Sequence, residues 1–210
     1  MSEFTSVTDY FREHYQLDNK ELLAEIEKVT EVRQVKEGEI LMTPGEVPPK
    51  ILFQAGGITR CYFYDERGRE HTESFSGQYN LPIMPPGGLG EPSGSYIEVL
   101  KPGIILAVPE DWVQEAFFRY REIQLLMYQI LAESAKANSE IRKVLYLYNA
   151  KQRYEWFKRR FPDACACVSQ RHAASFLNMS AETYCRIKRE CENRGKNPGG
   201  QASPNGEKSL

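Results

Sequence analysis

The sequence predicts an α+β protein with an N-terminal antiparallel β-roll, one long helix and a C-terminal helix-turn-helix. Between residues 31 and 110, short β-type runs alternate with Gly-containing turns, a pattern typical of antiparallel rolls and barrels. Residues 111–150 contain no Pro or Gly and are rich in helix-forming side chains. Residues 168–192 hold two short helical segments around a three-residue turn, which is the pattern of a helix-turn-helix.

Changes in composition divide the chain into five segments. We expect a helical lead over 1–30, the β-roll over 31–110, a dimerisation helix over 111–150, a helix-turn-helix domain over 151–194 and a disordered tail over 195–210. Leucines at helical spacing predict one helix over 7–29, with Asp18 as a cap for its second half. The stretch 82–94 is dense in Pro and Gly and predicts an irregular loop.

The distribution of charge points to a polyanionic partner for one end of the protein. The full chain has a net charge of −2, with 41% apolar and 27% charged residues, which excludes general disorder. Residues 1–139 carry 13 basic against 22 acidic side chains, whereas residues 140–194 carry 12 against 6. The sequence also lacks a run of 18 apolar residues and an apolar N-terminal signal core, so we expect a cytoplasmic protein.

Apolar residues in the long helix recur at spacings of three and four. We call the following set the seam: Ile123, Met127, Ile130, Ala137, Ile141 and Val144. A narrow apolar stripe that persists over several heptads is typical of helix pairing, so the seam predicts a homodimer. Packing of the same stripe on the protein's own β-domain is the alternative.

The C-terminal motif carries the expected signals for two short helices. Ser169 is placed to cap the first helix, Asn178 suits the left-handed turn, and Ser180 is placed to cap the second. Apolar side chains are spaced so that the two helices pack together; they are Ala173, Leu177, Met179, Tyr184 and Ile187. An ordinary helical hairpin on the surface is the alternative, and the net positive charge of this region favours a DNA-binding motif.

Residues of the second helix are candidates for reading DNA bases. Glu182, Arg186 and Arg189 project from the side opposite the apolar residues, where Arg186 could bond guanine and Glu182 could accept from cytosine. Residues near the helix starts are candidates for phosphate contacts, and these are Ser169, Gln170, Arg171, Ser180 and Thr183.

The order of these parts resembles the Crp/Fnr family of transcription regulators. The runs KEGEILMTPGE and ILFQAGGITRCYFYDERGREHTESF are similar to that family's cyclic-nucleotide-binding-type domain, and the likeness covers roughly residues 10–192. The run Ser180-Ala181-Glu182-Thr183 with Arg186 matches the start of the family's recognition helix, except that Ala181 replaces an Arg that often reads a base. The resemblance implies a winged-helix-like domain, a palindromic double-stranded DNA site, a homodimer, and RNA polymerase and a small-molecule effector as further partners.

The effector region departs from the cyclic-nucleotide binders of that family. Those proteins hold the ribose with a Gly-Glu pair and the cyclic phosphate with an Arg followed by Ser or Thr. Here Pro92 and Ser93 stand at the Arg-Ser position, and Gly90-Glu91 immediately precede them. A cyclic phosphate without its Arg partner loses a charge-assisted contact, so we do not expect cyclic AMP to bind. Gly90, Glu91 and Ser93 remain the candidate residues for a pocket that takes an unknown effector.

The other function classes find little support in the residues. Cys165 and Cys167, with two further cysteines nearby, lack paired metal-binding spacing, and a redox role for them is left open. His71 is the only histidine in the β-region, so it supports neither a cupin-type metalloenzyme nor a haem site by itself. We therefore expect no catalytic residues, no metal and no cofactor. A dimeric adaptor or small-ligand sensor that does not bind DNA is the remaining alternative.

Overall fold

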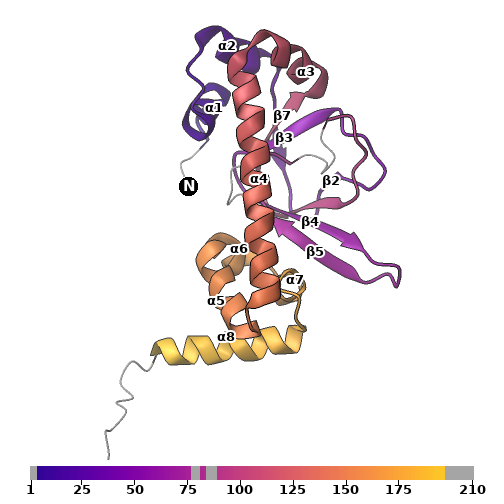
Figure 1. The fold of residues 1–210 in the computed structure, drawn as a ribbon, viewed down its shortest axis with the longest axis vertical. Coiled ribbons are helices and arrows are strands. Elements are labelled where there is room, and N and C mark those ends of the chain that lie inside the picture. The colour runs from indigo at the N-terminus through magenta and orange to yellow at the C-terminus, as the bar shows by residue number, and fades with distance from the viewer. Residues whose placement is uncertain (1–3, 77–80, 84–88, 197–210) are drawn as a thin grey trace, which may run out of the picture.

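The computed structural model describes residues 4–76, 81–83 and 89–196. The β-roll lies beside one long helix, with helices of the N-terminal half near one end of that helix and the C-terminal helices at its other end (Figure 1). The long helix α4 runs through the centre of the molecule and connects the β-roll to a helical C-terminal domain. Among the helices within these ranges, none has the length and apolar character needed to span a bilayer. Most of the expected tail, residues 197–210, lies outside the described residues, as do residues 84–88 of the Pro/Gly-rich loop.

The helical lead consists of two helices where the sequence predicted one. Helix α1 spans Val7–Tyr15 and α2 spans Lys20–Val29. Gln16 ends α1 in the left-handed conformation with φ of 52°, and this turns the chain away from the helix axis. The cap of α2 is Asn19, whose side chain accepts from the amides of Glu21 and Leu22, so the assignment of the cap to Asp18 was wrong.

The β-roll contains seven strands in two antiparallel sheets. The strands are β1 (Glu31–Val35), β2 (Ile40–Met42), β3 (Lys50–Gln54), β4 (Ile58–Tyr64), β5 (Glu70–Phe75), β6 (Tyr96–Lys101) and β7 (Gly103–Pro109). One sheet has the order β1-β7-β3 and the other the order β2-β6-β4-β5. Gly103 is the first residue of β7 and lies against the backbone of Gly56 and Gly57, so a side chain at this position would collide with that backbone. The strand positions confirm the expected alternation of strands and turns.

Tyr120 interrupts the helical region that the sequence predicted as continuous over 111–150. Helix α3 spans Glu110–Arg119 and α4 spans Arg121–Leu147, with Tyr120 in an extended conformation between them. The seam residues of α4 face their own chain, where four of them are buried and Met127 and Ile141 are partly buried. Ile123, Ile130 and Met127 pack on the β-roll and α1, whereas Ile141 and Val144 pack on the C-terminal domain, and Ala137 is buried as well. This placement corrects the assignment of the seam to a contact between two copies.

The opposite face of α4 carries a second apolar series. Leu125, Tyr128, Ala132 and Ala135 are exposed and follow spacings of three and four, and Tyr146 lies on the same face. Tyr128 is 71% exposed and Tyr146 is 80% exposed. The helix therefore has one apolar face that packs inside its own chain and one that remains at the surface.

In the C-terminal domain, all regular secondary structure of the described residues is helical. Its helices are α5 (Ala150–Arg160), α6 (Pro162–Cys167), α7 (Gln170–Phe176) and α8 (Ala181–Lys196). Pro162 lies in the first turn of α6, where a backbone N–H has no partner within the helix. The N–H that proline lacks is therefore not missed, and Pro162 begins α6 soon after α5 has ended. Helix α8 extends to Lys196, beyond the point where the sequence predicted the tail to begin. No strand that could form a wing occurs in this domain up to Lys196.

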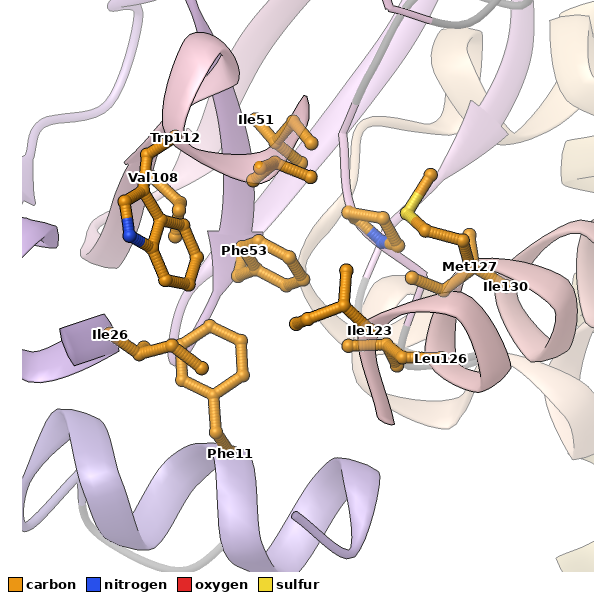
Figure 2. A pocket seen from close by; sticks show the side chains of 12 residues that line it. Phe11, Ile26, Ile51, Phe53, Val108, Trp112, Ile123, Leu126, Met127 and Ile130 are labelled. Carbon is orange, nitrogen blue, oxygen red and sulfur yellow. The ribbon is translucent and has the colours of Figure 1, made fainter. Parts of the chain in front are cut away.

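One apolar cluster joins the helical lead, the β-roll and α4. Figure 2 shows Phe11 and Ile26 of the lead pointing toward Phe53 of β3 and Ile123 of α4. These side chains surround a cavity of about 30 Å³ without polar lining, which is room for only one or two water molecules. The cluster fixes the N-terminal half of α4 against the roll.

Candidate nucleic-acid interface

Two capped helices and a left-handed residue build the helix-turn-helix. The Ser169 hydroxyl accepts from the amide of His172 at 3.1 Å, and the Ser180 hydroxyl accepts from the amide of Thr183 at 3.1 Å. Asn178 has a φ of 50°, which reverses the chain between α7 and α8. These three local features were predicted from the sequence, and the structure confirms each of them.

The packing side of the motif is an aromatic core. Ala173 and Ala174 of α7 are fully buried, and their small size lets α8 approach closely. Tyr184 of α8 packs edge-on against Tyr154 of α5, with 5.5 Å between the ring centroids. Desolvation by burial raises the pKa of Tyr184 above its ordinary value, so the hydroxyl stays neutral, and we infer a structural role for it.

The outward side of α8 brings the predicted base-reading residues together. Glu182, Arg186 and Arg189 are exposed and line one shallow surface hollow along the helix. Arg186 donates to Glu190 one turn further along at 3.0 Å, and its side chain is 65% exposed. An exposed ion pair of this kind is weak, so the guanidinium can exchange Glu190 for a base edge at little cost. The geometry therefore permits direct contact between this face and a major groove.

The candidate phosphate-binding residues lie at the starts of the same two helices. Ser169, Gln170 and Arg171 are exposed around the first turn of α7, and Ser180 is exposed before α8. Thr183 is partly buried, and its hydroxyl accepts from Ser180 at 3.0 Å. Arg171 and Ser180 share a groove with residues of the β4–β5 hairpin, of which Arg69 is one.

Arg153 is a structural residue of the motif that the sequence analysis missed. From α5 it donates to the carbonyls of Leu177 and Asn178 at 3.0 and 3.1 Å, and to that of Tyr148 at 2.9 Å. These bonds satisfy backbone oxygens of the turn, which have no partner in a helix. The only sequence signal was the basic character of the 151–162 segment, and this does not specify which Arg turns inward.

No family model and no curated protein matches the sequence. Among solved structures, FixK2 from Bradyrhizobium japonicum aligns with a TM-score of 0.69 at 16% identity, over 80% of this chain and 86% of that one. A crp/fnr-family regulator from Eubacterium rectale aligns with a TM-score of 0.67 at 14% identity, over 89% of each chain. The chain has the Crp/Fnr fold.

A third protein of this fold shows how far the likeness extends. The c-di-GMP responsive global regulator CLP of Xanthomonas campestris aligns with a TM-score of 0.61 at 11% identity, over 85% of this chain and 93% of that one. All three identities lie below the level at which a ligand or an operator can be transferred. The Crp/Fnr fold is therefore established, while the interface residues rest on their own geometry.

The structure gives little support to the effector residues predicted for this Crp/Fnr fold. Ser93 is buried, and its hydroxyl donates to the carbonyl of Ser95 at 2.7 Å and accepts from the Ser95 amide at 3.2 Å. Its backbone bonds the turn at Gly45 and Glu46. Glu91 is exposed, and Gly90 adopts a φ of 77°. Ser93 therefore holds the loop in place, and its hydroxyl is already occupied.

The cysteines of the C-terminal domain are free thiols within the described residues. Burial raises the pKa of Cys165 and also that of Cys167, so both side chains favour the protonated thiol. A protonated thiol is a weak nucleophile and a poor metal ligand. No group of three or more potential metal-binding side chains occurs among the residues that the structure describes.

Proposed function

We propose that the protein is a homodimeric transcription regulator that binds a specific double-stranded DNA site through α8. The observation that carries the proposal is the exposed row of Glu182, Arg186 and Arg189 on the second helix of a capped helix-turn-helix. The excess of basic residues in this region adds the attraction for phosphate that DNA binding requires.

The proposed dimer pairs the exposed face of α4 with the same face of a second copy. Leu125, Tyr128, Ala132 and Ala135 supply an apolar stripe at the spacing that helix pairing uses. A two-fold axis along α4 would present two α8 helices to successive major grooves, so the expected site is a palindrome with half-sites one helical turn apart.

Selection of bound sequences from random duplex DNA, using the purified full chain, tests the proposal. We expect an enriched palindrome and an affinity that falls steeply as the salt concentration rises. If no sequence is enriched and the protein is also retained only weakly on heparin, the alternative of an adaptor that does not bind DNA would be favoured.

A further inference from the structure

The edge of the β-roll is joined to α7 by a polar contact that DNA binding does not use. Strand β5 is an edge strand, so the backbone groups on its outer side have no strand partner. The Ser175 hydroxyl of α7 accepts from the amide of Thr72 at 2.9 Å and donates to the carbonyl of Glu70 at 3.4 Å. One side chain of the helix-turn-helix thus satisfies two backbone groups of the roll.

A chain of charged groups crosses the same boundary. Arg60 of β4 is only 2% exposed and donates to Glu70 and to Glu98, each at 2.6 Å. The second partner of Glu70 is His172 of α7, whose Nε2 lies 3.8 Å from the Glu70 carboxylate. Contacts between successive charged groups therefore connect the roll to the helix-turn-helix, in the order Glu98, Arg60, Glu70, His172.

This boundary also contains two buried side-chain nitrogens that have no hydrogen-bond partner. Among the described residues, the buried side-chain nitrogens without a hydrogen-bond partner are Arg60 Nε and His172 Nδ1. Buried polar atoms in folded proteins nearly always have partners, and exceptions often mark strained or switching sites. Both exceptions here belong to one contact between two domains, the β-roll and the helix-turn-helix.

The C-terminal domain has a short connection to α4. Only Tyr148 and Asn149 separate α4 from α5, and Asn149 caps α5 through a reciprocal pair of bonds with Gln152. Both helix ends are therefore well defined, and the two residues between them can act as a hinge. Loss of the polar contact at Glu70 and Thr72 would leave this hinge and the apolar packing of Phe75, at the other end of the same strand, as links to the roll.

We propose that the polar contact of β5 with α7 is a pH-sensitive latch, in which protonation of His172 opens the bonds between Ser175 of α7 and the edge of the β-roll. We define the latch as Arg60, Glu70, Thr72, His172 and Ser175. In the neutral imidazole, the Nε2–H can point toward Glu70 while Nδ1 carries a lone pair. Protonation would place an N–H donor at Nδ1, where the closed latch offers no acceptor.

The electrostatic surroundings of His172 also favour its neutral form while the latch is closed. Desolvation lowers the pKa of His172, and the cations Arg60 and Arg171 lower it further, while Glu70 and Glu98 oppose the shift in part. Because the pKa is lower in the closed latch than its ordinary value of 6.5, closure favours the neutral form. The latch is therefore fully stable above about pH 6.5 and weakens as the pH falls below that value.

Hydrogen exchange at the Thr72 amide measures closure directly, because its bond to Ser175 exists only in the closed latch. Exchange would be followed by NMR on the full chain between pH 7.5 and 5.5 and corrected for the intrinsic rate. In the wild type we expect protection of Thr72 to fall by up to about tenfold per pH unit below pH 6.5. The Tyr184 amide, which bonds within the helix-turn-helix, should keep its protection and so separate opening from unfolding.

Two matched variants complete the test. His172→Gln keeps a neutral amide at the Nε2 position and should hold Thr72 protection constant with pH. His71→Gln, on the same strand β5, should follow the wild type. Constant protection in the wild type, or the same pH dependence in His172→Gln, would overturn the proposal. If the Thr72 amide of His172→Gln is unprotected at every pH, the NMR titration of His172 in the wild type decides between the outcomes. A pKa of His172 below 6.5 supports the latch, and an unshifted pKa overturns it.

Discussion

The ring of Phe75, at the end of β5, packs edge-on against the ring of Phe176 on α7, with 5.3 Å between their centroids. Phe75 also lies 5.9 Å from Phe157 of α5, so it belongs to the core of the C-terminal domain. The β-roll and the helix-turn-helix therefore share apolar packing in addition to the polar latch.

Removal of the Phe75 ring should weaken both domains together. We expect Phe75→Ala to lower the free energy of unfolding by about 3–5 kcal/mol, because a large buried ring leaves a cavity. Urea denaturation measures this loss. Phe63→Ala, at a position 39% exposed on β4, serves as the control and should cost clearly less. Equal losses in the two variants would show that Phe75 is not part of a shared core.

Local features of the helix-turn-helix were predictable because a cap or a turn depends on a few neighbouring residues. Ser169, Asn178 and Ser180 each act within three or four positions of themselves. The strands of the roll were predictable for the same reason, since glycines and short apolar runs mark their ends.

The contacts between distant elements could not be predicted in this way. The spacing of the seam revealed an apolar face of α4, but it could not show that the roll, and not a second chain, covers that face. The break at Tyr120 has no Pro or Gly to mark it. The bonds of Arg60 to Glu70 and Glu98 depend on the pairing of β4 with β5 and β6, which a single sequence does not reveal.

The left-handed conformation of Asn178 allows the strain in the turn between α7 and α8 to be tested by substitution. A β-branched residue is strained at positive φ, whereas Gly adopts it freely. We therefore expect Asn178→Val to lower the free energy of unfolding by about 1–2 kcal/mol and Asn178→Gly to change it little. Thermal denaturation of the two variants distinguishes these outcomes, and similar melting temperatures would argue against the strained turn.

Glu25 should make part of the stability dependent on pH. Its carboxylate on α2 accepts from Arg119 at 2.6 Å, from the Tyr120 hydroxyl at 2.9 Å and from Trp112 at 3.3 Å. The hydrogen bonds from Arg119 and then Tyr120 lower the pKa of Glu25 from 4.5 to about 2. A carboxylate with a lowered pKa stabilises the fold above its ordinary value, and this contribution is lost as the pH falls toward the lowered one.

Glu25→Gln should therefore be less stable than the wild type at neutral pH, and the difference should shrink between pH 4.5 and about 2. Calorimetric melting over this range measures the convergence, with Glu13→Gln on the exposed side of α1 as the control. Stability curves that stay parallel down to pH 2 would rule out the role assigned to Glu25.

A charge on the exposed face of α4 should disrupt the proposed dimer. Tyr128→Glu would place two carboxylates in a dry interface, at a cost of several kcal/mol per dimer. Sedimentation should then show a monomer, while Gln129→Glu, which changes a neighbouring exposed residue on another side of the helix, should remain dimeric. A dimer that tolerates Tyr128→Glu would place the interface elsewhere.

Arg186 and Arg171 should affect DNA binding in different ways. Arg186→Ala removes the proposed contact to a base edge, so we expect a loss of about 1–3 kcal/mol at the preferred site and a relaxed preference at one base pair in each half-site. Arg171→Ala removes the proposed phosphate contact, so it should weaken binding to all sequences about equally and reduce the salt dependence.

The most direct test of the central claim is a titration of the wild type and Arg186→Ala against the selected operator and against the same operator with that base pair changed. The account predicts that the wild type distinguishes the two duplexes and that Arg186→Ala binds both with nearly the same, lower affinity. If Arg186→Ala keeps the affinity and the discrimination of the wild type, α8 does not read DNA, and the account is contradicted.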